Sequence, residues 1–211
     1  MIINNLTFVY GLVANCIIYV IFTFIALKYF KSFFPISISS VRSALSHDPI
    51  PRGLGVIFPI SFIVSSLIFY DSIEIIYSYY FLILFSTLIG FYDDVKNINY
   101  IKKLISLLVL FSFMVLINKE ILLFDDIFFI NSFLISVFFF IFYVLFFNQI
   151  DGINGLSSGT FCIFLTGLIT LNSSEFLTTS MFINIIGIVI LYFFSNTLLT
   201  KFFQGDSGAY F

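Results

Sequence analysis

Long apolar segments alternate with short polar ones along the whole chain. Seven apolar runs are long enough to be read as membrane spans, which need about 17–25 residues because lipid leaves the backbone no partner except itself. The runs cover residues 8–30, 53–70, 75–92, 104–118, 132–150, 155–171 and 181–199, of which the fourth and sixth are short. The alternation of apolar and polar residues that marks a membrane β-barrel is absent from the sequence. The pattern predicts an all-α, polytopic integral membrane protein with seven transmembrane helices.

The composition excludes most classes of soluble protein. Hydrophobic residues occupy 61% of the 211 positions and charged residues only 9%, whereas a soluble domain usually carries about 25% charged residues. A soluble enzyme and a disordered chain are therefore not expected. The net charge of −2 provides no basic surface, so no nucleic-acid partner is expected. Cys16 and Cys162 lie in apolar runs and are interpreted as packing residues, and a single histidine makes a zinc site improbable.

The positive charges predict the orientation of the chain in the membrane. No basic residue precedes the first span, which argues against a cleaved signal peptide and for an external N-terminus. Segments that follow the odd-numbered spans share one side, and that side holds eight of the nine basic residues: Lys28, Lys31, Arg42, Arg52, Lys96, Lys102, Lys103 and Lys201. Because lysine and arginine accumulate in cytoplasmic loops, this side is predicted to be cytoplasmic.

Four polar or glycine-rich clusters lie at the predicted cytoplasmic ends of spans. They comprise residues 47–55, 90–94, 148–155 and 205–208. The predicted orientation rests only on the basic residues and the lengths of the spans. The location of all four clusters on one side is therefore an observation independent of it. Polar groups near membrane depth are costly and commonly functional. The clusters are therefore predicted to converge on one site.

The acids of these clusters resemble a site of hard oxygen ligands, formed by Asp93, Asp94, Asp151 and Asp206. Carboxylates without histidine or cysteine suit Mg²⁺ or Mn²⁺ rather than zinc. Taken singly, each acid is better explained as a helix cap or as the partner of a nearby lysine such as Lys96, Lys102 or Lys103. Adjacent aspartates on a helix point about 100° apart, so one is expected to hold a ligand while the other caps or orients. The glycines beside four one-sided clusters favour a site.

Other polar residues of the clusters have two interpretations each. Asn148 suits base or sugar recognition, but also a helix end. The basic loop residues suit a phosphate, but also topology and anionic lipid headgroups. His47 suits a general acid or a diphosphate contact, but also an ordinary loop position. Gly155 and Gly159 have the spacing of a helix-packing motif, although glycine also admits the close approach of a phosphate.

The order of the motifs resembles the polyprenyl-phosphate N-acetylhexosamine-1-phosphate transferases. That family includes enzymes that initiate O-antigen and teichoic-acid synthesis, and the peptidoglycan lipid I translocase. Lys103, before Leu104, resembles the basic residue that follows the aspartate pair in the family. The matching motifs are His47 with Pro51-Arg52-Gly53-Leu54-Gly55, Gly90-x-x-Asp93-Asp94, Asn148-x-x-Asp151-Gly152-x-Asn154-Gly155, and Gly205-Asp206-Ser207-Gly208.

The resemblance implies a membrane phosphoglycosyl transferase. It would move a sugar-1-phosphate from a UDP-sugar to polyprenyl (undecaprenyl) phosphate, release UMP and so initiate a cell-surface glycan such as the O-antigen of lipopolysaccharide. Mg²⁺, or alternatively Mn²⁺, is the implied cofactor, with Asp206 as its ligand. The implied catalytic residues are Asp93, Asp94 and Asp151, and the implied substrate-binding residues are His47, Arg52, Lys103, Asn148 and Asn154. The implied location is the bacterial inner membrane, with the site facing the cytoplasm. Membrane lipids are expected as partners, and a homodimer is one open alternative.

The chain also departs from the family pattern. Leu54 stands where many members have glycine, and Asn154 replaces a common aspartate, so that it can donate hydrogen bonds but adds no charge for a metal. Residues 1–211 are predicted to form a single membrane-embedded domain, which ends at Phe211, directly after the fourth motif. Family members continue with further spans and a histidine-rich loop, which we expect this domain to lack. We therefore expect it to have little activity alone. The alternatives are an inactive or truncated fragment and, on weaker grounds because the acids lie at span ends, a transporter.

Overall fold

The computed structural model describes residues 2–37, 50–69, 76–117, 129–150, 155–171, 176–198 and 204–211. Its longer helices follow the apolar runs. They are α1 (Ile2–Tyr29), α2 (Ile57–Phe69), α3 (Ile76–Lys96), α4 (Tyr100–Ile117), α5 (Phe129–Ile150), α6 (Leu156–Leu171) and α7 (Phe176–Leu198). The shorter elements are the 3₁₀ turns η1 (Lys31–Phe33) and η2 (Leu54–Val56), the strands β1 (Ile36–Ser37) and β2 (Ile50–Pro51), and α8 (Gly205–Ala209).

The expectation of a helical membrane protein is confirmed in its general form. Three described helical segments are long and apolar enough to cross a membrane, namely Val9–Tyr29, Tyr100–Ile117 and Asn131–Ile150. Large apolar side chains also stand exposed on α1, α4 and α5, such as Phe24, Val109 and Phe138, the last with 70% of its surface exposed. Apolar surface of this extent is typical of a protein that faces lipid rather than water.

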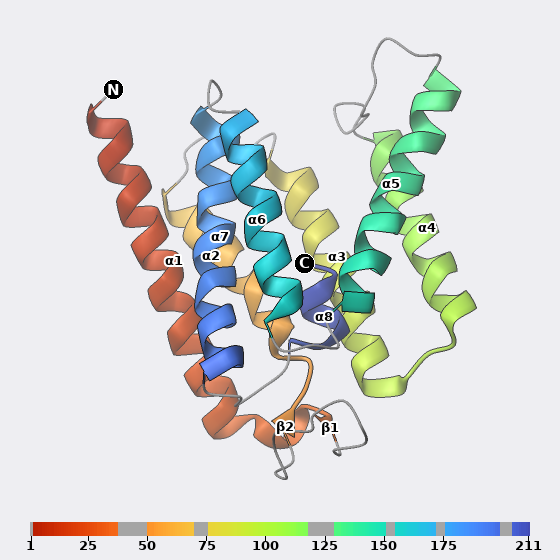
Figure 1. The fold of residues 1–211 in the computed structure, drawn as a ribbon, viewed down its shortest axis with the longest axis horizontal. Coiled ribbons are helices and arrows are strands. Elements are labelled where there is room, and N and C mark those ends of the chain that lie inside the picture. The colour runs from red at the N-terminus through yellow and green to blue at the C-terminus, as the bar shows by residue number, and fades with distance from the viewer. Residues whose placement is uncertain are drawn as a thin grey trace.

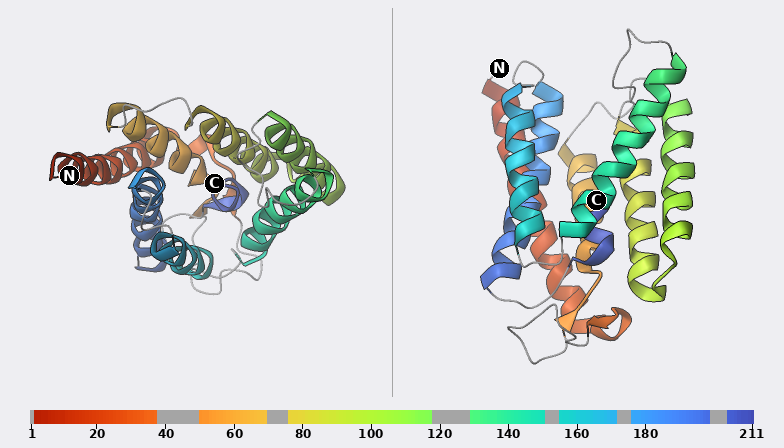
Figure 2. Two further views of the ribbon diagram at one scale, coloured as in Figure 1. Left: turned by 90° about the horizontal axis from the view of Figure 1, so that it is seen from above. Right: turned by 45° about the vertical axis from the view of Figure 1, so that its right-hand side comes forward.

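The long helices surround the short helix α8. In the view along the bundle, α8 and the C-terminus lie among the longer helices (Figure 2). Helix α1 packs on α2 and α7, α6 packs on α7, and α4 packs on α3 and α5, while α8 packs chiefly on α3 and η2. This arrangement places the fourth sequence cluster beside the second.

The last described residues connect two hydrophobic cores. One core is built from α1, α2 and α7 around Phe62 and Ile188, and the ring of Phe211 packs against it. The other is built from α4 and α5 around Leu107 and Val115, and it includes Tyr210 of the C-terminal segment. The position of α8 is therefore determined from both sides.

A short antiparallel pair accounts for the only β-structure in the described ranges. Ile36 pairs with Pro51, and Ser37 pairs with Ile50. Just beyond the pair, the backbone N–H of Arg52 donates to the carbonyl of Pro35, at 2.8 Å. This hairpin lies at the same end of the molecule as the end of α1 (Figure 1) and directs the first cluster toward α8.

Candidate active site

Five charged side chains from four segments form one network of ion pairs: Arg52, Asp93, Asp94, Lys103 and Asp206. Nε of Arg52 lies 2.9 Å from Oδ1 of Asp94, and Nη2 of Arg52 lies 2.9 Å from Oδ1 of Asp206. Nζ of Lys103 lies 2.5 Å from Oδ2 of Asp93 and 2.5 Å from Oδ2 of Asp206. Each cation therefore bridges two carboxylates, and Asp206 is the carboxylate that both cations share. These five residues are called the ion-pair network below.

The adjacent aspartates at the end of α3 have different partners. Oδ1 of Asp93 accepts the backbone N–H of Ile98 at 2.8 Å, which secures the turn after the helix. The two carboxylate oxygens of Asp94 accept the backbone N–H groups of Asp206, at 2.9 Å, and Ser207, at 3.0 Å. Neighbouring helical positions point about 100° apart, so the two side chains cannot share all their partners. Asp94 holds the start of α8 in place, and Asp93 orients Lys103.

The network is largely removed from water. The side chain of Asp94 is 0% exposed and that of Asp206 is 11% exposed. Burial raises the pKa of Asp94 to about 6, although the backbone amide of Ser207 acts in the opposite direction. Burial also acts on Asp206, but its interactions with Asp93 and Lys103 and the charges of both cations outweigh that effect and lower its pKa to about 2. The two cations therefore favour the ionised form of Asp206.

Motif glycines allow the backbone of α8 to approach its neighbours closely. A Cβ atom on Gly90 would lie 2.5 Å from the carbonyl oxygen of Asp206. A Cβ atom on Gly55 would overlap the backbone of Gly208. Gly205 has a φ of +70° and packs against the carboxylate of Asp94. The glycines beside the aspartates thus permit the backbone approach that brings the charged groups together.

The structure brings five of the nine predicted site residues together, and these are the members of the ion-pair network. Asn148 lies in the last turn of α5 and is partly exposed, and it is not one of the five members of the ion-pair network. His47, Asp151 and Asn154 lie outside the described residues. Their predicted roles therefore stay predictions.

The donor set of the network fits Mg²⁺ only in a restricted way. Within the described part of the chain, no group of three or more histidine, cysteine or acidic side chains is placed to hold a metal ion. Arg52 and Lys103 stand between the carboxylates instead. Mg²⁺ is nevertheless commonly bound by one or two carboxylates together with substrate phosphates. Asp206, whose buried carboxylate keeps 11% of its side chain exposed, is the residue that would fit that kind of site.

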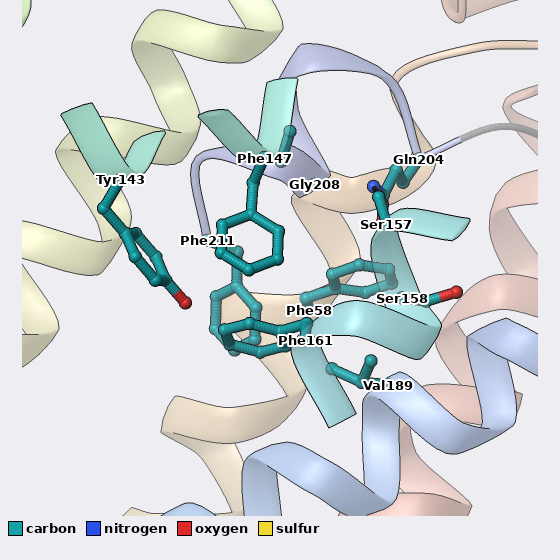
Figure 3. A pocket seen from close by; sticks show the side chains of 11 residues that line it. Phe58, Tyr143, Phe147, Ser157, Ser158, Phe161, Val189, Gln204, Gly208 and Phe211 are labelled. Atoms are coloured by element: carbon teal, nitrogen blue, oxygen red, sulfur yellow. Dashed lines mark hydrogen bonds between the residues drawn. The ribbon is translucent and has the colours of Figure 1, made fainter. Parts of the chain in front are cut away.

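Beside the network lies a small aromatic cavity of about 30 Å³. It is bounded by α2, α5, α6, α7 and the C-terminal segment. Figure 3 shows the rings of Phe58, Phe147, Phe161 and Phe211 around it, with Gln204 at its edge. The segment that carries Asp206 therefore also contributes Gln204, Gly208 and Phe211 to the wall of the cavity.

Two residues near the network were not predicted. The ring centroid of the buried Tyr210 lies 5.4 Å from Nζ of Lys103, a distance at which the ring face attracts the cation. Gln204 is buried and bonded to several segments. Both lie within two residues of the fourth motif, which is the one signal in the sequence that could have indicated them.

Comparison with known proteins adds a family assignment to this geometry. The model of the family described as glycosyl transferase family 4 matches residues 76–211. The matched segment contains Asp93, Asp94, Lys103 and Asp206, and it begins after Arg52. Among curated proteins, none matches the chain.

Proposed function

The chain belongs to glycosyl transferase family 4, and on that premise we propose that it transfers an N-acetylhexosamine-1-phosphate from a UDP-sugar to a polyprenyl phosphate. The family consists of phosphoglycosyl transferases, which use a nucleotide-sugar donor and a lipid-linked phosphate acceptor in a membrane. The observation that carries the proposal is the ion-pair network, because it gathers two cations and an ionised carboxylate at one place.

The reaction needs a site that neutralises phosphate charge. An oxygen of the acceptor phosphate attacks the phosphorus atom next to the sugar, the bond from that phosphorus to the bridging oxygen breaks, and UMP leaves. Phosphoryl transfer depends on positioning and charge stabilisation more than on covalent chemistry. Arg52 and Lys103 are held in place by carboxylates before any substrate binds. Such preorganised cations stabilise developing negative charge effectively.

The carboxylates have other tasks than that of a general base. A phosphomonoester has a second pKa of about 6 and is mostly a dianion at neutral pH, so the acceptor needs no proton removed. Asp93 and Asp94 orient Lys103 and α8 in this proposal. Asp206 would hold Mg²⁺ or Mn²⁺, which supplies positive charge at the donor diphosphate when bound.

The proposed orientation in the membrane places the site at the cytoplasmic interface. Seven spans with an external N-terminus put eight of nine basic residues on the inner side of a bacterial plasma membrane. There the lipid acceptor arrives laterally from the bilayer and the nucleotide-sugar arrives from the cytoplasm. The particular sugar and the downstream glycan, such as the O-antigen, are part of the proposal and not of the family assignment.

A labelling experiment tests the proposal. Membranes from cells that express the chain are given labelled UDP-N-acetylhexosamine and polyprenyl phosphate, with Mg²⁺ or with a chelator. Because little activity is expected of residues 1–211 alone, we expect a small amount of Mg²⁺-dependent label in the lipid extract and its loss in Asp206→Ala. The control is Asp125→Ala, in a segment that the sequence places on the external side, which should retain labelling. No label from the unchanged chain would contradict the function, and full labelling by Asp206→Ala would contradict the role of Asp206.

A further inference from the structure

Gln204 is a buried polar residue at the junction of three segments. It is 4% exposed and immediately precedes α8. Its backbone N–H donates to Oη of Tyr192 in α7, at 3.1 Å. Its side-chain Nε2 donates to Oγ of Ser157 in α6, at 2.6 Å. Its carbonyl oxygen accepts the backbone N–H of Gly55 in η2, at 3.0 Å. Gln204 therefore connects α8 to three elements at once.

These bonds hold the side of α8 that the ion-pair network does not reach. Asp94 fastens the first amides of α8 to α3. The carbonyl of Gln204 also accepts Oγ of Ser207 at 2.8 Å, so the first turn of α8 is bonded to Gln204. Asp206 follows Gln204 by two positions. A movement of Gln204 relative to α6 would consequently move Asp206 relative to Arg52 and Lys103.

Burying the side-chain amide of Gln204 costs desolvation free energy, which its hydrogen bonds must offset. Gln204 borders an aromatic cavity with Phe58, Phe161 and Phe211 (Figure 3), where an apolar side chain would be easier to bury. Burying an amide without a hydrogen-bond partner in apolar surroundings is strongly unfavourable. A hydrogen bond to Ser157 is directional and therefore favours one position of α8. Apolar packing, which is not directional, would restrict the position of α8 less.

We propose that Gln204 is a positioning residue, which through Ser157 holds Asp206 between Arg52 and Lys103. The catalytic consequence rests on the proposed function, whereas the structural consequence does not. Because α6 and α7 supply the partners of Gln204, the placement of the charged site depends on helices that contribute none of its five side chains.

Matched serine variants separate the hydrogen bond from simple packing. Ser157 and Ser158 are neighbouring buried residues of α6, and both line the cavity. Ser158 donates to the carbonyl of Gly155 within its own segment, at 3.4 Å. Ser157→Ala removes the bond to Gln204, Ser157→Thr keeps the hydroxyl, and Ser158→Ala is the control. Gln204→Leu removes the bond from the other side.

A spectroscopic readout tests the placement of α8 without reference to activity. Tyr210 is replaced by 3-fluorotyrosine, whose ¹⁹F resonance reports the environment beside Lys103. We expect Gln204→Leu and Ser157→Ala to shift this resonance and Ser157→Thr and Ser158→Ala to leave it unchanged. An unchanged resonance in both of the first two variants would overturn the proposal. A shift in Ser157→Thr equal to that in Ser157→Ala would also overturn it, because packing rather than the hydroxyl would then be responsible.

Transferase kinetics on the same proteins test the catalytic consequence. A misplaced Asp206 should lower kcat by about tenfold while KM for the UDP-sugar changes little, since a shift of about 1 Å in a reacting site can cost up to about 100-fold. Gln204→Leu combined with Ser157→Ala should lower kcat by less than the product of the two single effects, because both substitutions remove the same hydrogen bond. If the resonance shifts as expected but the unchanged chain transfers no label, the positioning role stands and the proposed function fails.

Discussion

At the scale of single residues, Lys103 is the more deeply buried of the two cations in the ion-pair network. Its side chain is 10% exposed, lies between Asp93 and Asp206, and faces the ring of Tyr210. Removing one partner from a buried ion pair leaves an uncompensated buried charge. The resulting loss of stability is much larger than the net stabilisation that the intact pair provides. The neighbouring Lys102 is exposed. The two lysines therefore offer a direct comparison of a buried and an exposed charge.

Lys103→Met is expected to lower the free energy of unfolding by about 3–5 kcal/mol, because Asp93 and Asp206 lose their common cation. Lys102→Met, the same change one position earlier, should stay within about 0.5 kcal/mol of the unchanged chain. Denaturant unfolding in detergent micelles measures both values. Equal effects of the two substitutions would show that Lys103 is not held in a buried ion-pair network.

Arg52→Lys preserves the charge but not the geometry of the site. An ammonium group cannot present two N–H groups in a fixed fork to Asp94 and Asp206. One charge-assisted hydrogen bond is lost, so kcat/KM of the labelling reaction should fall by about 10- to 100-fold. Lys31→Arg, a conservative change at an exposed residue of η1, should leave kcat/KM unchanged. Full activity of Arg52→Lys would mean that the bridge between Asp94 and Asp206 is dispensable.

At the scale of elements, the crossing of α3 and α8 determines whether the charged groups can meet. Gly90 lies at this crossing, against the backbone of Asp206 and Ser207. Beyond the crossing, α3 ends in a turn in which Asn97 has a φ of +48° and donates its N–H to the carbonyl of Asp93. The short helix α8 makes too few internal hydrogen bonds to be stable alone, so its structure depends on these contacts.

Gly90→Ala should destabilise the protein by about 1–3 kcal/mol, because the added methyl group forces α3 and α8 apart. It should also reduce transferase activity, since Asp206 moves with α8. Gly167→Ala is the matched control: apart from the backbone of its own helix, no atom of the described segments lies within 4 Å of the added Cβ atom, and alanine favours a helix over glycine by up to about 1 kcal/mol. Thermal unfolding in micelles compares the two. A stabilising effect of Gly90→Ala would contradict the close crossing.

At the scale of the whole molecule, the proposed orientation makes a prediction about accessibility. Lys31 is an exposed residue of η1, just after α1, and Lys96 is an exposed residue at the end of α3. In a background without Cys16 and Cys162, cysteine at either position should react with a membrane-impermeant maleimide only after the cells are permeabilised. Glu120→Cys, in a predicted external segment, should react in intact cells. Labelling of Lys31→Cys and Lys96→Cys from opposite sides would contradict a common membrane face for the first and second clusters.

The pattern of apolar residues was sufficient to predict the helices. Each predicted span is helical over most of its described length, because helix formation in an apolar environment is a local requirement of the backbone. The sixth span, predicted for residues 155–171, starts one position before α6 and ends at the same residue. The motifs also selected Arg52, Asp93, Asp94, Lys103 and Asp206 as candidates, the two cations through their resemblance to family motifs, and the structure brings these five residues together.

The pairing of those charges was decided by the tertiary structure. The sequence left the aspartates free to pair with several lysines, whereas in the structure Lys103 reaches Asp206 across 103 positions and Lys102 faces outward. The roles of Gln204 and Ser157 likewise depend on α6 and α8 being side by side, which no local pattern shows. Helix formation depends on neighbours along the chain and can be inferred from it, but the partner of a side chain depends on how distant helices cross and how closely their backbones approach.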